Sequence, residues 1–347
     1  MSDGRLRPLA EAIERLRWPD ALERHSPLTG DCVLAVDMVD PVDVAPRARL
    51  DAQVLAGCRG VLALLPCPTV ALLRRGIEPT ASASELAPHF DVIAESDDDL
   101  AAVCDAIERN PLASQALVQL LRMGERLDVH GGLVAESLVY SMLQAGPEFA
   151  DWAKGRSGVI SPPPQEEPAV LAERDGSRLS LVLNRPEKHN AFSSAIRDAL
   201  VEGLSVALAD DTIDEIRLSG RGPSFCSGGD LDEFGTFPDP TTAHAIRSTR
   251  NASRLLALCA DRVTATVHGA CIGAGVELPA FARHVVARGD AFFQLPELGM
   301  GLVPGAGGTV SLPRRIGRQR TALLALTGRR IDAATALRLG VVDDLVG

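Results

Sequence analysis

A chain of 347 residues that is 46% hydrophobic and 23% charged is long enough for two domains and has the composition of a soluble globular protein. Its net charge of −11 argues against general binding to nucleic acid or to acidic membranes. Its seven cysteines are scattered and contain no C-x-x-C pair, so the sequence indicates neither a disulfide framework nor a zinc site, which suits a reducing compartment.

The first third of the chain has the pattern of a small α/β layer. Apolar positions recur at helical spacing from Leu6 to Trp18, without the apolar core of a signal peptide, and no run in the chain is long enough to span a bilayer. We therefore expect a cytoplasmic protein. Three short apolar runs, separated by helical patterns, predict buried strands at Cys32–Met38, Gly60–Leu65 and Phe90–Ala94.

From residue 97 to residue 156 the pattern becomes helical. Three aspartates at 97–99 and Pro111 predict the starts of two helices, at Asp97–Arg109 and Pro111–Arg122. Helical patterns predict two more, at Gly132–Gln144 and around Glu148–Lys154. The segment 157–167 contains three consecutive prolines, which can enter neither a helix nor a central strand. It is the predicted linker between an N-terminal region, 1–156, and a second domain, 168–347.

Strands and helices alternate beyond this linker. A β-hairpin is expected around Asp175–Gly176, because two apolar runs flank that turn signal. A helix at Ser193–Leu208 and a strand at Glu215–Leu218 follow. The apolar run Val263–Val267 reads as another buried strand. Alternation of this kind is compatible with any α/β fold.

The stretch 268–308 carries the strongest functional signal. Small residues at Gly273–Gly275 open a short helix and expose backbone N–H groups, which can hold an anion or a developing oxyanion. Glu277 lies in the first turn of that helix, and Glu297 comes from a separate element. Two carboxylates that converge on a polarised carbonyl are suited to proton transfer beside it. Taken alone, an acidic residue in a first helical turn often only compensates the helix dipole, so the combination carries the signal.

A series of motifs occupies the second half of the chain. They are Leu183–Pro186 with Asn190–Ala191, Phe225–Leu231, His268–Leu278, Pro296–Glu297, Pro304–Thr309, Leu326–Gly328 with Ala333–Ala334, and Leu339–Val342. In this order they resemble the crotonase, or enoyl-CoA hydratase/isomerase, superfamily over roughly half the chain. The resemblance implies an α/β fold with a crotonase-like ββα spiral core at about 168–347, preceded by a smaller α/β and helical region. It also implies a homo-oligomer, either a trimer or a hexamer.

The resemblance implies an acyl-CoA thioester as the substrate, with coenzyme A as part of that substrate and with no separate cofactor or metal. By matching motifs, the backbone N–H groups of Gly229 and Ala274 form an oxyanion hole. Relatives that have both glutamates usually add water across a 2,3-double bond. Glu277 would then hold and deprotonate the water, and Glu297 would exchange the proton at C2. The matching substrate or coenzyme A contacts are Lys188, His189, Ser227, Asp230, Leu231, Asp232 and Gly273, although Lys188 and His189 suit a solvated turn equally well.

The leading hypothesis is therefore an enoyl-CoA hydratase. The first alternative keeps the fold and the oxyanion hole but isomerises an enoyl-CoA, or oxygenates an aryl-acetyl-CoA without a cofactor. The second alternative is a non-catalytic acyl-CoA-binding partner subunit. Retention of both glutamates argues against it, because binding alone needs neither carboxylate.

The N-terminal half is expected to replace a missing tail. The chain stops at Gly347, where relatives continue into helices that close the acyl pocket, and residues 97–156 resemble that tail. We therefore expect a degenerate crotonase-like unit whose helices pack on the catalytic half of the same or a neighbouring chain. The alternative is an independent helical appendage. The residues expected to face the catalytic half are Leu117, Leu120, Leu121, Leu133, Leu138 and Met142.

Overall fold

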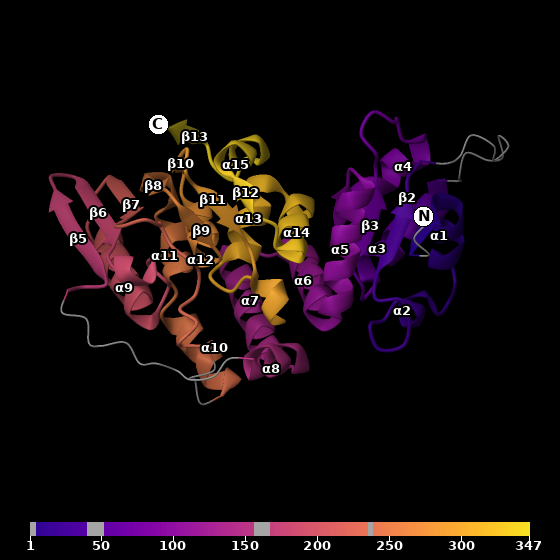
Figure 1. Cartoon of the computed structure of the whole chain (residues 1–347), viewed down its shortest axis with the longest axis horizontal. Coiled ribbons are helices and arrows are strands. Elements are labelled where there is room, and N and C mark those ends of the chain that lie inside the picture. The colour runs from indigo at the N-terminus through magenta and orange to yellow at the C-terminus, as the bar shows by residue number, and fades with distance from the viewer. Residues whose placement is uncertain (1–4, 40–51, 156–166, 235–238) are drawn as a thin grey trace. The chain divides into compact units, whose positions relative to one another are not determined.

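The computed structural model describes residues 5–39, 52–155, 167–234 and 239–347 (Figure 1). The chain divides into two compact units. The N-terminal unit comprises residues 1–122 and 318–327, and the C-terminal unit comprises residues 123–317 and 328–347. The division follows residue 122, whereas the predicted linker lies at 157–167, almost all of it outside the described residues. Both units combine helices with mainly parallel sheets, so the expected α/β class is confirmed.

The N-terminal unit is built on a four-stranded parallel sheet. Its strands lie in the order β1 (Leu6–Pro8), β2 (Leu34–Asp37), β3 (Thr69–Leu72) and β4 (Val92–Ala94). Its helices are α1 (Leu9–Leu16), α2 (Ala21–Arg24), α3 (Ala52–Leu64), α4 (Ala81–Leu86), α5 (Asp97–Arg109), α6 (Pro111–Gly124, which crosses the division) and α14 (Arg318–Thr327).

One predicted strand of this unit is wrong. The run Gly60–Leu65 lies at the end of α3, and the strand that follows is β3. A short apolar run is compatible with a buried helix as well as with a buried strand. Here Leu62 is a fully buried residue of α3. The predicted strands at Cys32–Met38 and Phe90–Ala94 are confirmed as β2 and β4.

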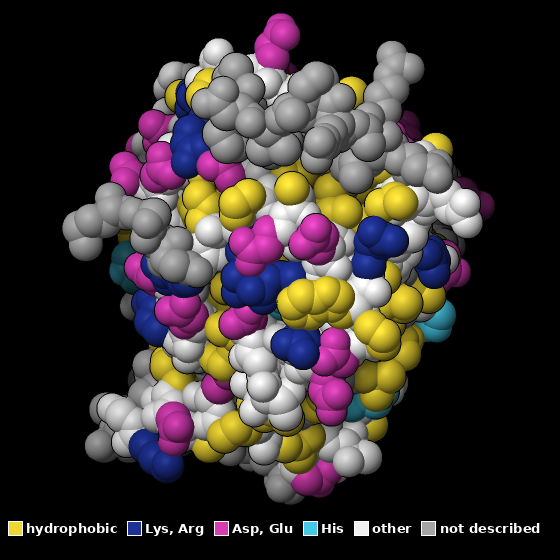
Figure 2. Space-filling view, turned by 90° about the vertical axis from the view of Figure 1, so that its right-hand side faces the viewer, with side chains coloured by type: hydrophobic (Ala, Val, Ile, Leu, Met, Phe, Trp, Pro, Cys, Tyr) yellow, Lys and Arg dark blue, Asp and Glu magenta, His cyan; other side chains and the backbone are white. Residues whose placement is uncertain are grey.

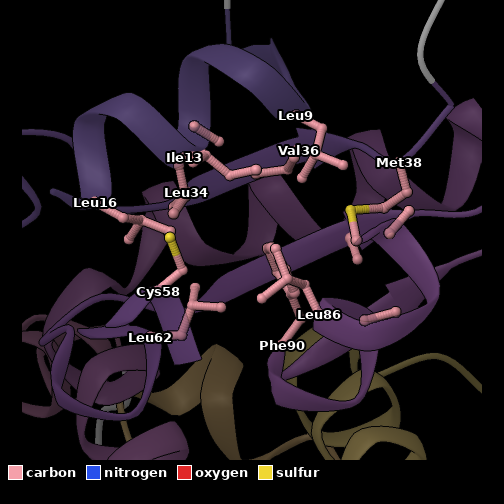
Figure 3. Packing of buried hydrophobic residues seen from close by; sticks show 14 of the residues in the cluster. Leu9, Ile13, Leu16, Leu34, Val36, Met38, Cys58, Leu62, Leu86 and Phe90 are labelled. Atoms are coloured by element: carbon pink, nitrogen blue, oxygen red, sulfur yellow. The ribbon is translucent and has the colours of Figure 1, made fainter. Parts of the chain in front are cut away.

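The hydrophobic core of the N-terminal unit lies between its sheet and the helices α1, α3 and α4 (Figure 3). Leu34 and Val36 of β2 alternate with Ala35, which is also buried, and with Asp37, which is half-buried. The other labelled members of this cluster are Leu9, Ile13, Leu16, Met38, Cys58, Leu62, Leu86 and Phe90.

A buried carboxylate ties α14 to the N-terminal unit. Asp91, which is 1% exposed, accepts hydrogen bonds from the backbone and hydroxyl of Thr69, both at 2.9 Å. It also accepts bonds from Arg122 at 2.8 and 2.5 Å and from Arg318 at 2.8 Å. Two guanidinium groups therefore compensate one buried negative charge. Arg318 begins α14, so a segment from the second half of the chain completes the N-terminal unit.

The C-terminal unit contains two sheets. The strands of the six-stranded sheet lie in the order β13 (Asp344–Val346), β10 (His284–Arg288), β8 (Val263–Val267), β7 (Glu215–Gly220), β6 (Arg178–Leu183) and β5 (Val170–Asp175). The strands of the three-stranded sheet lie in the order β12 (Ile331–Asp332), β11 (Phe292–Gln294) and β9 (Ala270–Ile272). Consecutive strands alternate between the sheets, because β8 and β10 enter the large one while β9 and β11 enter the small one. This alternation is the expected ββα spiral. The predicted hairpin is confirmed by the antiparallel pair β5–β6.

Helices from before residue 156 cover part of this unit. Its helices are α7 (Val129–Gln144), α8 (Pro147–Lys154), α9 (Ser194–Ala209), α10 (Pro240–Thr249), α11 (Ala252–Leu258), α12 (Ala274–Glu277), α13 (Gly308–Ile316) and α15 (Ala333–Leu339). Helix α7 packs against α10, α11 and α13 (Figure 1). A Cβ atom at Gly132 of α7 would lie 3.0 Å from Val310 of α13, so the two helices approach closely.

The six apolar residues expected to face the catalytic half fall into three groups by their exposure and by the unit to which they belong. Leu133 is buried within the C-terminal unit, as expected. Leu138 and Met142 are 53% and 58% exposed, so neither is covered by the catalytic half of this chain. That part of the expectation is wrong for the chain itself, because both side chains lie on the outer face of α7. Leu117, Leu120 and Leu121 are buried and belong to the N-terminal unit.

Charges of both signs are interspersed with hydrophobic side chains on the face drawn in Figure 2. Ion pairs on the surface of the N-terminal unit include Arg59 with Glu85 and Arg74 with Asp37. Such exposed pairs contribute little stability individually. Within the described ranges, every helix is too short or too polar to cross a bilayer.

Candidate active site

A cavity of about 170 Å³ lies in the C-terminal unit. Its walls come from α7, α10 and α12 and from the loops that precede α9, α11 and α13. The residues predicted to form the oxyanion hole, Gly229 and Ala274, line it together with Glu277 and Glu297. Segments separated by nearly 70 residues in the sequence therefore bring the four predicted catalytic groups to one cavity.

Backbone geometry leaves two N–H groups unused at this cavity. The N–H of Phe192 donates to the carbonyl of Gly228, and the N–H of Asp230 donates to the carbonyl of Phe192. Between these two bonds, the N–H of Gly229 has no acceptor among the described residues. Ala274 is the first residue of α12, where an N–H has no intrahelical partner. The chain enters this helix through Gly273, which has φ = 50°, a conformation that favours glycine. Both N–H groups are thus free to donate to a ligand.

Glu277 is held from one side by the start of α13. It is 2% exposed, and its Oε2 accepts hydrogen bonds from the N–H groups of Ala306 at 2.7 Å and Gly308 at 2.8 Å. Burial raises the pKa of Glu277 well above its usual value, and the nearby charges of Glu297 and Glu136 raise it further. The two backbone donors oppose this shift because they favour the ionised form.

Glu297 is the first residue of the 3₁₀ turn Glu297–Met300 and reaches the cavity from that turn, whereas Glu277 reaches it from α12. A Cβ atom at Gly273 would lie 2.5 Å from its Oε1, so a larger residue there would displace this carboxyl group. Its Oε2 is buried and has no hydrogen-bond partner among the described residues. Burial raises the pKa of Glu297 to about 8. Near neutral pH this group can therefore carry the proton that a reaction at the cavity would require.

A third glutamate at the cavity was missed by the sequence analysis. Glu136 of α7 accepts hydrogen bonds from Gly307 N–H at 2.7 Å, from Thr309 N–H at 3.0 Å and from the Thr309 hydroxyl at 2.6 Å. Burial raises its pKa to about 7. Four consecutive N–H groups, from residue 306 to residue 309, are thus divided alternately between Glu277 and Glu136.

The sequence did contain a signal for Glu136. It is the only acidic residue of α7, VHGGLVAESLVYSMLQ, which is otherwise largely apolar. An acidic residue inside an apolar helix is rarely buried without a specific partner. Tyr140, the single tyrosine of the chain, follows one turn later and also lines the cavity. A Cβ atom at Gly305 would lie 2.4 Å from its ring, so the ring rests on the loop that binds both glutamates.

The residues expected to contact coenzyme A form a charged cluster beside the oxyanion loop. Lys188 donates to Asp232 at 2.6 Å and lies 3.5 Å from Asp230. Asp230 is buried and also accepts from Arg185 at 3.1 Å. The hydrogen bond to Asp232 raises the pKa of Lys188. Among these residues only Asp230 lines the cavity, so in this structure the others brace the loop.

His189 and Ser227 join the same cluster. His189 has φ = 51° and is exposed, and its Nδ1 lies 3.0 Å from the hydroxyl of Ser224. The N–H of Ser227 donates to the carbonyl of His189 at 3.0 Å. Leu231 is half-buried in the turn that follows Asp230. Their predicted contacts with substrate remain predictions.

Comparison with known proteins identifies the family. Residues 173–347 match the family model described as enoyl-CoA hydratase/isomerase. The 2,3-dehydroadipyl-CoA hydratase of Escherichia coli K12 is 35% identical over 51% of this chain and 68% of that protein, and the 1,2-epoxyphenylacetyl-CoA isomerase of the same organism is 34% identical over 51% and 69%. A solved enoyl-CoA hydratase from Thermoplasma volcanium GSS1 is 35% identical over 52% of this chain and 73% of that chain, with a TM-score of 0.48. The chain is therefore an enzyme of the enoyl-CoA hydratase/isomerase family, within the crotonase superfamily.

Proposed function

We propose that this enzyme adds water to 2,3-unsaturated acyl-CoA thioesters. The observation that carries the proposal is the convergence of Glu277 and Glu297 on a cavity that also presents the unused N–H groups of Gly229 and Ala274. Water addition needs a base for water, an acid for C2 and donors for the thioester oxygen. The cavity supplies one group for each task.

The reaction follows from these positions. The thioester oxygen accepts from Gly229 N–H and Ala274 N–H, each contributing on the order of 3 kcal/mol to the transition state. Ionised Glu277 takes a proton from water while the water oxygen forms its bond to C3. The electrons of the double bond move toward the thioester, which becomes an enolate. Protonated Glu297 then gives its proton to C2, and transfer of the proton on Glu277 to Glu297 restores the starting state.

The hydrogen bonds made by the two carboxylates suit this division of labour. Glu277 accepts two backbone N–H bonds that favour its ionised form, whereas Oε2 of Glu297 has no partner among the described residues. Because the two groups interact, their titration belongs to the pair. With one proton shared between them, we assign it to Glu297 before water addition.

Isomerisation is the second candidate. A relative that is 34% identical is named as an isomerase of an epoxyphenylacetyl-CoA. The same carboxylates and oxyanion donors can move a proton between two carbons without adding water. Cofactor-free oxygenation of an aryl-acetyl-CoA and a purely binding role are the further alternatives. The cytoplasmic location, the coenzyme A contacts and assembly as a trimer or hexamer also remain proposals.

A product assay tests the proposal. The protein is mixed with a set of 2-enoyl-CoA esters while ultraviolet absorbance of the conjugated thioester and dissolved oxygen are followed together. We expect loss of conjugated absorbance, appearance of a 3-hydroxyacyl-CoA and no oxygen uptake. An isomeric enoyl-CoA as the main product would favour isomerisation, oxygen consumption with an aryl-acetyl-CoA would favour oxygenation, and either result would overturn the hydratase assignment.

A further inference from the structure

Three arginines line the cavity, and they differ in how their charge is balanced. Arg197 lies 2.8 Å from the carboxylate of Asp198. Arg250 lies 2.9 Å from the same carboxylate and 3.2 Å from Glu202. Arg247 has no carboxylate within ion-pair distance in the described part of the chain. Among the described residues it is the arginine of the cavity wall that lacks an ion-pair partner.

Neutral groups hold Arg247 in place. It lies on α10, which packs against α7. Its Nε donates to the hydroxyl of Ser137 at 3.1 Å, and Nη2 donates to the hydroxyl of Ser141 at 2.5 Å. Its Cζ lies 4.9 Å from the ring centroid of Tyr140, a cation–π distance. All three partners come from α7, so the guanidinium has a fixed position.

The hydrogen bonds of Ser137 and Ser141 add to this rigidity. Ser137 Oγ lies 2.9 Å from Nδ1 of His244, which is also on α10. Ser141 Oγ donates to the carbonyl of Ser137 at 2.8 Å, so its lone pairs are available to Arg247. The position of the guanidinium is therefore set before any ligand binds.

The charge of Arg247 remains uncompensated at short range. Burial lowers its pKa, which expresses the cost of desolvating a cation without a counterion. Glu136 attracts it electrostatically, but both oxygens of Glu136 are bound by the segment that contains Gly307 and Thr309. Nη1 of Arg247 has no acceptor among the residues described. A preorganised cation with an unused donor faces the cavity.

We propose that Arg247 binds a carboxylate at the far end of the acyl group, so that the substrate is the coenzyme A monothioester of a short dicarboxylic acid. The proposal rests on the proposed function in taking an acyl-CoA as the ligand of this cavity. A cavity of about 170 Å³ accommodates about half a dozen non-hydrogen atoms, because a cavity of about 150 Å³ holds benzene. A short acyl chain therefore fits between the oxyanion donors and the cavity wall.

A competing explanation is that Arg247 only offsets the charges of the three cavity glutamates. The two explanations differ in their consequences. An offsetting charge affects every acyl-CoA alike, whereas a carboxylate receptor discriminates by the terminal group. The matched comparison is therefore between acyl chains of equal length that end in a methyl group or in a carboxylate.

Binding measurements on the full chain provide the test and do not require turnover. Calorimetry is carried out with saturated pairs: succinyl- and butyryl-CoA, glutaryl- and valeryl-CoA, and adipyl- and hexanoyl-CoA. At one or more lengths we expect the carboxylate-terminated ester to bind roughly 10- to 100-fold more tightly, as for a hydrogen bond between charged groups. Arg247→Met should abolish this preference. Arg250→Met should keep it, because Arg250 is already paired.

The outcomes are decisive in either direction. Equal or tighter binding of the methyl-terminated esters at every length by the wild-type protein, or no binding of any ester, would overturn the proposal. Retention of the preference in Arg247→Met would overturn it as well. Hydration is assayed separately with the corresponding 2-enoyl esters. A carboxylate preference without hydration would leave the Arg247 site intact and contradict only the hydratase assignment.

Discussion

Two regions of this molecule bury carboxylates, and they do so in opposite ways. In the N-terminal unit, Asp91 is surrounded by Thr69, Arg122 and Arg318, so one negative charge has two cationic partners. In the C-terminal unit, Glu277 and Glu297 share a cavity wall with a third glutamate, and Oε2 of Glu297 has no partner within the described ranges.

The difference separates an acid suited to a structural role from acids suited to proton transfer. A buried carboxylate that is paired with two guanidinium groups holds separate segments of the chain together. Carboxylates that line one cavity and are shielded from water have raised pKa values and can exchange protons near neutral pH. Neutralising Asp91 should therefore lower the free energy of unfolding, whereas neutralising Glu277 or Glu297 should lower the activity.

The largest effect is expected at Asp91. Asp91→Asn leaves Arg122 and Arg318 without their buried counterion, which should lower the free energy of unfolding by about 3–5 kcal/mol. Urea denaturation followed by circular dichroism measures this. Asp97→Asn is the control, because Asp97 pairs with Arg74 on the exposed surface and its loss should leave stability close to that of the wild type. Equal stability of both variants would show that Asp91 has no structural role.

The glutamates of the cavity should show the reverse behaviour. Glu277→Gln and Glu297→Gln should each reduce hydration at least ~100-fold, equivalent to about 2.7 kcal/mol of transition-state stabilisation, because each removes a positioned acid or base. Binding of a saturated acyl-CoA should largely survive, as calorimetry can establish. Near wild-type turnover in either variant would contradict the two-carboxylate mechanism.

A smaller effect on rate is expected at Glu136. Glu136→Gln keeps one acceptor for the loop but removes a negative charge that raises the pKa of Glu277. We expect about a 10-fold loss in kcat, the cost of one imperfect hydrogen bond near the site, and an acidic limb of the pH–rate profile shifted to lower pH. Asp151→Asn on the exposed face of α8 is the control and should change neither. An unshifted profile in Glu136→Gln would assign Glu136 a purely structural role.

A further effect concerns stability and pH. Because burial raises the pKa of Glu297 to about 8 in the folded protein, the unfolded chain releases this proton at lower pH, and stability falls as pH rises from about 4.5 to about 8. In thermal unfolding, the midpoint temperature of Glu297→Gln should rise relative to that of the wild type as the pH rises across that window. The shift should be roughly 2–4 °C for each kcal/mol of difference in the free energy of unfolding. A difference independent of pH would contradict the raised pKa.

Local motifs predicted the reactive region better than the structural one. Gly273–Gly275, Glu277 and Glu297 were identified from the sequence because backbone donors and carboxylates leave recognisable short patterns. The helices α5–α9 and the hairpin β5–β6 were also predicted, since their apolar spacing, capping residues and turn residues are local. The strand assigned to Gly60–Leu65 failed because six apolar or small residues do not distinguish a helix from a strand.

Long-range partnerships could not be predicted from local patterns. Arg318 follows the last family motif of the cavity, yet its carboxylate partner is Asp91 in the N-terminal unit. Glu136 lies about 170 residues before the loop that it binds. The local sequence around Arg318 or Glu136 does not indicate which residue it binds, because such pairs form only when the chain folds. The expectation that helices before residue 156 pack on the catalytic unit agrees with α7, but it did not identify Glu136 as the contact.

The central claim is that the cavity glutamates add water to an enoyl-CoA thioester. The most direct measurement is the mass spectrum of the product formed from a 2-enoyl-CoA in D₂O and then returned to H₂O. We expect the product to gain the mass of one water and to keep a single non-exchangeable deuterium at C2, with both changes slowed at least ~100-fold in Glu277→Gln and Glu297→Gln. Product that has gained no water, or full rates of water addition in either variant, would contradict the account.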